Sequence, residues 1–275
     1  MKKTNVRALS ECGIMIAFSL VLSLITLGNL PAGGSVTLAS MLPIVVVSYR
    51  WGLKFGLFSA FASSLLQLTL GLSAFSYVTT WQSVLAVALL DYIVAYLVYG
   101  LSGIFRRFFE NQFPAMTLGA LMAGVLRYLC HVISGATVWA GLSIPDSAAL
   151  LYSISYNATY MIPDTLILFI VTGYVSLLID FKRTLPTRIK RKSASRLTAT
   201  LSFTSTLALI STIIYDAITI FSALQAESGE FDITRLTLVD WTKVGIASLI
   251  GALFVCVSLI LIFVHEKKIS KKLNQ

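Results

Sequence analysis

Ionisable side chains interrupt several long apolar stretches of this chain, and their spacing indicates a binding site. Arg127, His131, Gly135 and Trp139 recur every four residues, so on a helix they lie along one face. Asp91 lies near the middle of the preceding apolar stretch. Ionisable groups are expensive to keep in hydrocarbon, so each needs a partner or a function.

Aromatic residues with the same spacing follow in the next apolar stretch. Tyr152, Tyr156 and Tyr160 are four residues apart, and Asn157 is adjacent to the second of them. Aromatic faces attract a delocalised cation, and a buried carboxylate supplies the counter-charge. An amide and an imidazole can satisfy ring nitrogens and an amino group by directed hydrogen bonds. The combined set predicts an outward-facing pocket for a small, flat, positively charged ligand.

Each of these residues also has a structural interpretation. Asp91 and Arg127 could form an interhelical ion pair, His131 could be a satisfied interhelical residue, and the tyrosines could belong to an interfacial aromatic belt. An intramembrane enzyme using His131 with Asp91 or Asp164 as base and acid is a further alternative, although no HExxH or serine-based motif accompanies them. Asp164 follows a proline and could cap a helix break, and Asp216 has no visible partner.

The composition places these residues in a membrane. Hydrophobic residues make up 57% of the 275 residues, charged residues only 12%, and the mean hydropathy is +0.85. A soluble domain of this length cannot hide so much apolar surface. The net charge of +9 comes from short basic clusters between apolar runs, which argues against a nucleic-acid partner. The sequence contains no GxxxxGK[ST] loop, so the chain does not hydrolyse ATP itself, and we expect no cofactor or metal.

Apolar windows of roughly 20 residues, the length that crosses about 30 Å of hydrocarbon, predict an all-α polytopic membrane protein. The eight windows lie near 8–28, 36–49, 52–71, 78–105, 114–137, 147–180, 196–225 and 238–264. Lys and Arg gather in alternate loops and at both ends, which places both termini in the cytoplasm. We therefore divide the chain into a six-helix substrate-binding domain (1–182), a basic cytoplasmic linker (183–195) and a two-helix transmembrane extension with a basic tail (196–275).

Three stretches carry a resemblance to a known family. They are Leu89–Tyr92 (LLDY), Leu126–Gly135 (LRYLCHVISG) and Tyr152–Tyr160 (YSISYNATY), and upstream segments within 33–54 fit the same pattern. The similarity spans roughly residues 5–180 and resembles the thiamine-specific S components (ThiT/YuaJ type) of energy-coupling-factor (ECF) transporters. A related S component for a thiamine precursor such as hydroxymethylpyrimidine is the alternative in the same class.

The resemblance implies an importer subunit of the cell membrane and a set of functional residues. It implies a six-helix bundle that captures thiamine on the outer side and associates with a transmembrane coupling subunit and two cytoplasmic ATPases, surrounded by membrane lipids. The implied ligand-binding positions correspond to Asp91, Tyr92, Arg127, His131, Gly135, Trp139, Tyr152 and Asn157.

This chain departs from the family pattern at two positions, and its first helix has a candidate surface for a partner. Some relatives have glutamate at Asp91, and some have tryptophan in the first outer loop where this chain has Gly34. Trp81 or Tyr77 could replace that aromatic wall. Gly13 and Ala17 form a small-xxx-small pair in the first helix, and in the family a similar pair contacts the coupling subunit. The terminal helices lie outside the resemblance and have no predicted role beyond packing or partner contact.

Overall fold

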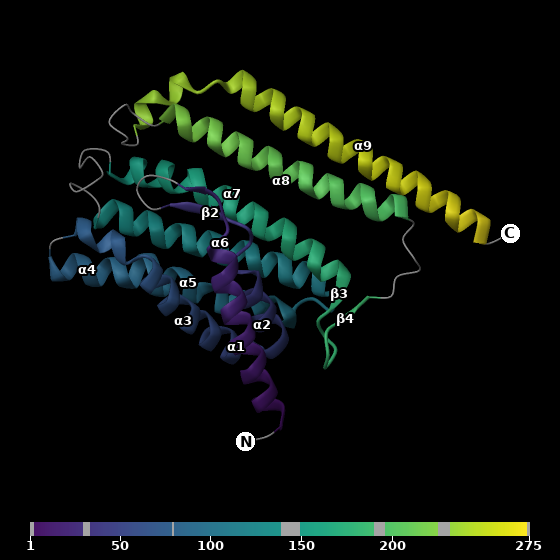
Figure 1. Cartoon of the computed structure of the whole chain (residues 1–275), viewed down its shortest axis with the longest axis horizontal. Coiled ribbons are helices and arrows are strands. Elements are labelled where there is room, and N and C mark those ends of the chain that lie inside the picture. Colours follow the sequence, from purple (N-terminus) through teal and green to yellow (C-terminus); the bar gives the residue numbers. More distant parts are fainter. Residues whose placement is uncertain are drawn as a thin grey trace. The chain divides into compact units, whose positions relative to one another are not determined.

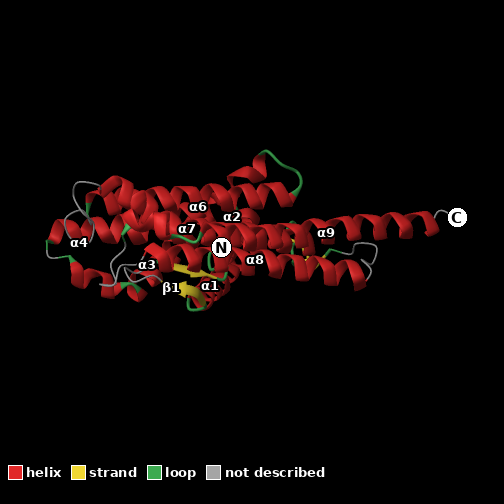
Figure 2. Ribbon diagram, turned by 90° about the horizontal axis from the view of Figure 1, so that it is seen from above, coloured by secondary structure: helices red, strands yellow, loops and turns green. Residues whose placement is uncertain are grey.

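The computed structural model describes residues 3–29, 34–78, 80–138, 149–189, 196–224 and 232–273. Helices dominate it, and the few strands are short (Figure 2). The chain divides into two compact units, Met1–Arg188 and Ile189–Gln275. The predicted functional division into a binding domain, a linker and an extension stays a prediction.

In the part of the first unit that the structure describes, five helical segments are long and one, α2, is short. They are α1 (Lys3–Ser23), α2 (Leu42–Trp51), α3 (Leu53–Leu70), a continuous stretch over Trp81–Arg107, α6 (Gln112–Thr137) and α7 (Ala149–Leu178). The fourth stretch consists of α4 (Trp81–Val87), the π-helix η2 (Ala88–Val94), α5 (Ala95–Leu97) and the 3-10 helix η3 (Val98–Arg107). A 3-10 turn, η1 (Leu72–Tyr77), follows α3.

A β-hairpin replaces the expected end of the first helix. The first apolar window was expected to be helical to about residue 28, but α1 ends at Ser23. Thr26–Asn29 (β1) pairs antiparallel with Ser35–Thr37 (β2), with Thr26 opposite Thr37. Threonine, glycine and asparagine are poor helix formers, and hairpin pairing satisfies their backbone groups.

The second helix is short and enclosed. It begins at Leu42 rather than near residue 36, with Pro43 in its first turn, a position where the missing N–H costs nothing. Ten residues are about 15 Å long, and residues 42–50 are all buried. Among the described residues, seven other helical segments are long and apolar enough to cross a membrane. The predicted all-α polytopic membrane architecture is thereby confirmed, with α2 packed inside the bundle.

A local helix break at Pro163 was one expectation from the sequence. The structure instead shows a continuous helix α7 there. The Asp164 side chain is buried and bonded to other elements, so it does not cap a helix break. A second hairpin follows α7, in which β3 (Ile179–Asp180) pairs with β4 (Thr187–Arg188).

The second unit is a helical hairpin of α8 (Arg196–Leu224) and α9 (Trp241–Leu273), joined through η5 (Ile233–Leu238). The two helices lie side by side (Figure 1). A Cβ added at Gly251 would meet the Thr212 side chain, so glycine permits their close approach. Asp216, which had no visible partner in the sequence, accepts a hydrogen bond from Ser248 Oγ at 2.6 Å.

Candidate functional site

The carboxylate of Asp91 is held by two side chains from α6. Its Oδ1 lies 3.0 Å from Nδ1 of His131, and its Oδ2 accepts a hydrogen bond from Ser134 Oγ at 2.7 Å. The Asp91 and His131 side chains are only 13% and 11% exposed. The structure thus brings together two of the predicted site residues and adds Ser134, which sequence reasoning missed.

A local change of helix type presents Asp91. The residue lies in the π-helical segment Ala88–Val94, between the α-helical turns of α4 and α5. A π-bulge inserts an extra residue into the helical repeat and is frequent at functional sites. The insertion rotates the following side chains relative to the preceding turns, so local spacing alone does not reveal which face carries Asp91.

Asn157 on α7 bonds to the backbone of His131 on α6. Its Nδ2 donates to the backbone oxygens of Ser153 at 2.8 Å and His131 at 3.3 Å, and its Oδ1 accepts a hydrogen bond from Tyr160 Oη at 2.6 Å. The rings of His131 and Tyr160 meet edge to face with centroids 6.2 Å apart. The amide is therefore fixed in one orientation between α6 and α7. We call Asp91, His131, Ser134, Asn157 and Tyr160 the Asp91 cluster.

Three tyrosines extend the cluster along α7. The rings of Tyr152 and Tyr156 are stacked with centroids 6.5 Å apart and planes 14° from parallel. Tyr156 and Tyr160 meet edge to face at 5.8 Å. All three tyrosines are buried, which does not fit the alternative that they form an exposed interfacial belt. Their faces provide the π-electron density that attracts cations.

The charge of the Asp91 cluster depends on His131. With a neutral imidazole the cluster carries one net negative charge, and with an imidazolium it carries none. Nε2 of His131 is buried and has no hydrogen-bond partner among the described residues. A buried polar atom without a partner costs free energy.

Arg127 belongs to a different cluster. Its Nη1 lies 3.4 Å from Asp164 Oδ2, its Nη2 donates to Tyr96 Oη at 2.9 Å, and its guanidinium stacks on the Tyr96 ring at 4.3 Å. Asp164 Oδ1 accepts hydrogen bonds from the backbone N–H and the hydroxyl of Thr37, both at 2.8 Å. Arg127 therefore pairs with Asp164 and not with Asp91, the partner considered from the sequence. The Asp164 carboxylate also connects β2 to α7.

The sequence signal for this Arg127 cluster was incomplete. Asp164 and Arg127 stood out as ionisable residues in apolar stretches, but Thr37 and Tyr96 look like ordinary strand and helix residues. Thr37 precedes α2 by several positions and reaches Asp164 only because β2 packs on α7. No local spacing indicates such a contact.

The remaining predicted ligand-binding residues are dispersed. Gly135 is buried where any side chain would collide with Ser153, so it lets α6 and α7 approach. Tyr92 donates to the Gly71 carbonyl at 3.0 Å and stacks on Phe75 at 5.9 Å. Trp81 begins α4 and is 71% exposed. Trp139 lies outside the described residues. Ligand contact by these four residues stays a prediction.

Gly34 lies directly against the Asp91 cluster. A Cβ at this position would approach the Tyr160 ring atoms Cδ1 and Cε1 at 2.6 and 2.7 Å. The backbone just before β2 therefore lies on the ring of Tyr160. A larger side chain there would require Tyr160 to move.

The predicted docking pair lies on the outside of α1. Gly13 and Ala17 are exposed, and a Cβ added at Gly13 would meet nothing within 4 Å. Ala8, Cys12 and Ser19 are fully buried on the opposite face. Packing of the Gly13/Ala17 pair inside this bundle, the alternative interpretation, does not fit this exposure.

Comparison with known proteins identifies the family. A thiamine transporter protein family (Thia_YuaJ) matches residues 9–184. The thiamine transporter ThiT of Bacillus subtilis (strain 168) is 34% identical over 174 residues, covering 59% of this chain and 86% of that protein. A solved structure of ThiT from Listeria monocytogenes shares the fold at 24% identity, covering 63% of this chain and 95% of that one, with a TM-score of 0.51. This chain, a multi-pass membrane protein, therefore belongs to the thiamine transporter protein family.

Proposed function

We propose that this protein is the substrate-binding (S) subunit of an ECF-type importer in the cell membrane. It captures thiamine at the Asp91 cluster, which opens to the outer side, and releases it inward with energy from separate ATPase subunits. Family membership supports the transport role. The proposal adds the site, the orientation and the partners.

The observation that carries the proposal is the Asp91 carboxylate buried beside aromatic rings. Thiamine joins a positively charged thiazolium ring to a flat aminopyrimidine. The carboxylate supplies the counter-charge, and the tyrosine faces suit a delocalised cation. His131 Nε2, which has no hydrogen-bond partner among the described residues, accepts a hydrogen bond from the pyrimidine amino group when the imidazole is neutral.

The orientation follows from the distribution of basic residues. Lys and Arg cluster at the N-terminus, at residues 50–54, 106–107 and 182–196, and at residues 267–272. Basic clusters of this kind remain on the cytoplasmic side. Both termini are then cytoplasmic, and the β1–β2 hairpin beside the Asp91 cluster is external.

Transport by this subunit requires partners, because the sequence has no GxxxxGK[ST] loop. The exposed Gly13/Ala17 face of α1 is suited to a coupling-subunit helix, since small residues let two backbones approach closely. Two cytoplasmic ATPase subunits complete the proposed assembly.

Direct binding tests the site. Purified full-length protein is titrated with thiamine, and we expect Asp91→Asn and Asn157→Ala each to weaken binding about 10- to 100-fold, the scale of losing a hydrogen bond to a charged group. Asp216→Asn is the matched control, because it removes a carboxylate from a membrane helix outside the family match. Unchanged affinity in both site variants would refute the proposed pocket.

The ligand's identity needs a second titration. Hydroxymethylpyrimidine lacks the thiazolium cation and cannot use the Asp91 counter-charge. We expect it to compete with thiamine only weakly. Competition at equal concentrations would favour the precursor as the transported substrate.

A further inference from the structure

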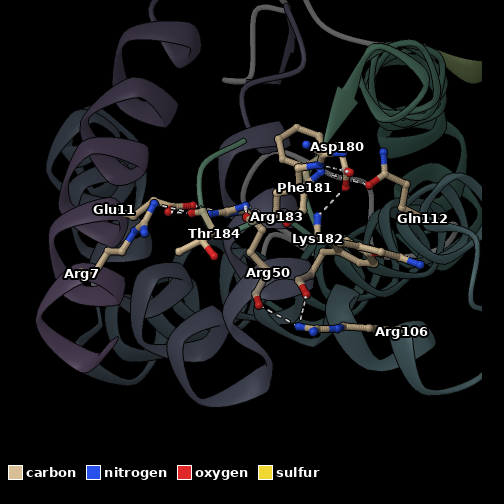
Figure 3. Close-up of polar contacts among 11 residues, drawn as sticks. Arg7, Glu11, Arg50, Arg106, Gln112, Asp180, Phe181, Lys182, Arg183 and Thr184 are labelled. Atoms are coloured by element: carbon tan, nitrogen blue, oxygen red, sulfur yellow. Dashed lines mark hydrogen bonds and ion pairs between the residues drawn. The ribbon is translucent and has the colours of Figure 1, made fainter. Parts of the chain in front are cut away.

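The described residues line an open cavity at the end of the first unit opposite the β1–β2 hairpin. Its volume is about 420 Å³. The lining residues come from α1, α2 and the turn between β3 and β4, and they are Arg7, Arg50, Trp51, Phe181, Lys182, Arg183 and Thr184. Figure 3 shows these basic side chains converging around that turn.

Arg50 organises the wall of the cavity. Its guanidinium pairs with the Glu11 carboxylate through Nε and Nη2. It also donates to the backbone oxygens of Phe181 at 2.7 Å, Arg183 at 3.1 Å and Thr184 at 3.3 Å. Arg50 is buried, so it fixes the β3–β4 turn on α1 and α2 (Figure 3).

These bonds occupy the acceptors of the cavity and leave positive charge. Thr184 O also accepts a hydrogen bond from Arg7. Of the four cationic lining residues, Arg50 pairs with Glu11 and Arg183 with Asp180. Arg7 and Lys182 have no carboxylate within ion-pair distance among the described residues. The cavity therefore has two uncompensated cations and favours an anion.

Exposed apolar residues flank two of the lining residues in the chain. Leu185 follows Thr184 and is 69% exposed, and Val6 precedes Arg7 and is 50% exposed. Trp51 and Phe181 contribute aromatic walls. Basic groups next to exposed apolar and aromatic side chains are typical of surfaces that meet both lipid headgroups and acyl chains.

We propose that this cavity binds the phosphate-bearing headgroup of an anionic phospholipid of the cytoplasmic leaflet. The leaflet assignment rests on the orientation given under the proposed function. A free phosphate ion has the same chemistry. It would fill only a small part of the cavity, because a small molecule such as water takes up about 30 Å³. A free ion also makes no use of the exposed apolar residues that flank the lining residues in the chain. A headgroup with its acyl chains uses both the basic cavity and these apolar residues.

The test uses full-length, delipidated protein in a neutral detergent. Its Tm is followed during titration with short-chain phosphatidylglycerol, with phosphatidylcholine and with inorganic phosphate. Phosphatidylglycerol should raise the Tm, and Arg7→Gln/Lys182→Gln should weaken its apparent affinity about 25-fold, or about fivefold for each basic residue removed. Lys54→Gln/Arg107→Gln removes the same net charge from exposed positions outside the lining and should respond like the unmodified protein.

Specific outcomes would overturn the proposal. An equal Tm rise with phosphatidylcholine, a response to inorganic phosphate at the same concentration, or equal losses in the two double variants would each do so. Arg7→Lys/Lys182→Arg keeps both charges and should retain binding, which separates charge from folding. Thiamine affinity, measured on the same samples, should stay unchanged in every variant, so failure here is distinguishable from failure of the proposed function.

Discussion

Two carboxylates contact α6 one helical turn apart, and their surroundings differ. Asp164 faces Arg127 and also accepts two hydrogen bonds from Thr37. Asp91 faces His131 and Ser134. The first carboxylate is paired with a permanent cation, whereas the second is paired with a group that need not be charged.

We infer from this difference that Asp164 has a structural role and that Asp91 has the proposed binding role. The Arg127–Asp164 pair is neutral as a whole and links β2, the fourth helical stretch, α6 and α7. The Asp91 cluster has a net negative charge whenever His131 is neutral. We therefore place the proposed ligand cation at Asp91, and we assign Asp164 the structural role of holding the hairpin.

Asp164→Asn should have the largest effect on stability. Breaking one side of a buried ion pair costs about 3 to 5 kcal/mol, and the Asp164 side chain is only 5% exposed. Thermal unfolding in detergent measures the loss. Replacing both partners with Arg127→Met/Asp164→Leu should recover much of the stability. A double variant no more stable than Asp164→Asn would contradict this structural role of the ion pair.

His131→Gln should reduce thiamine affinity about tenfold, with a smaller effect on unfolding, because it removes the partner of Asp91 and the Nε2 acceptor. Calorimetric titration of the single and double variants with Asp91→Asn gives their coupling. We expect about 1 to 2 kcal/mol, because residues in one hydrogen-bonded network are not additive.

The pair Asp91→Asn/Asp216→Asn is the reference for that coupling and should be additive, since Asp216 bonds to Ser248 within the other unit. If the effects of the His131 and Asp91 substitutions on thiamine affinity add, the two residues act independently. The cluster then does not bind the ligand through a charge shared by the two residues.

Tyr160→Phe should have the smallest effect of the three. It removes the hydroxyl that donates to Asn157 Oδ1 but keeps the ring beside His131. Losing one neutral hydrogen bond costs about 1 kcal/mol, so thiamine affinity should fall about fivefold. Fluorescence titration is sufficient for this measurement. A loss as large as that of Asp91→Asn would indicate that the Tyr160 hydroxyl itself contacts the ligand.

Within single helices, the sequence was informative. The cost of polar groups in hydrocarbon forces long apolar windows, and these windows predicted the polytopic helical architecture that the structure confirms. Four-residue spacing placed Arg127 and His131 on one face of α6, because helical periodicity is a local property. The same reasoning grouped His131 with Asp91 and Asn157, which the structure brings into contact.

Contacts between helices were decided by the tertiary structure. Periodicity gives a face but no axial register, so it could not choose between Asp91 and Asp164 as the partner of Arg127. Register depends on how backbones pack, as where Gly135 admits Ser153 and thereby places Asn157 beside His131. The π-helical turn at Asp91 and the β2 contact with Asp164 likewise depend on distant neighbours, because local propensity is too weak to specify them.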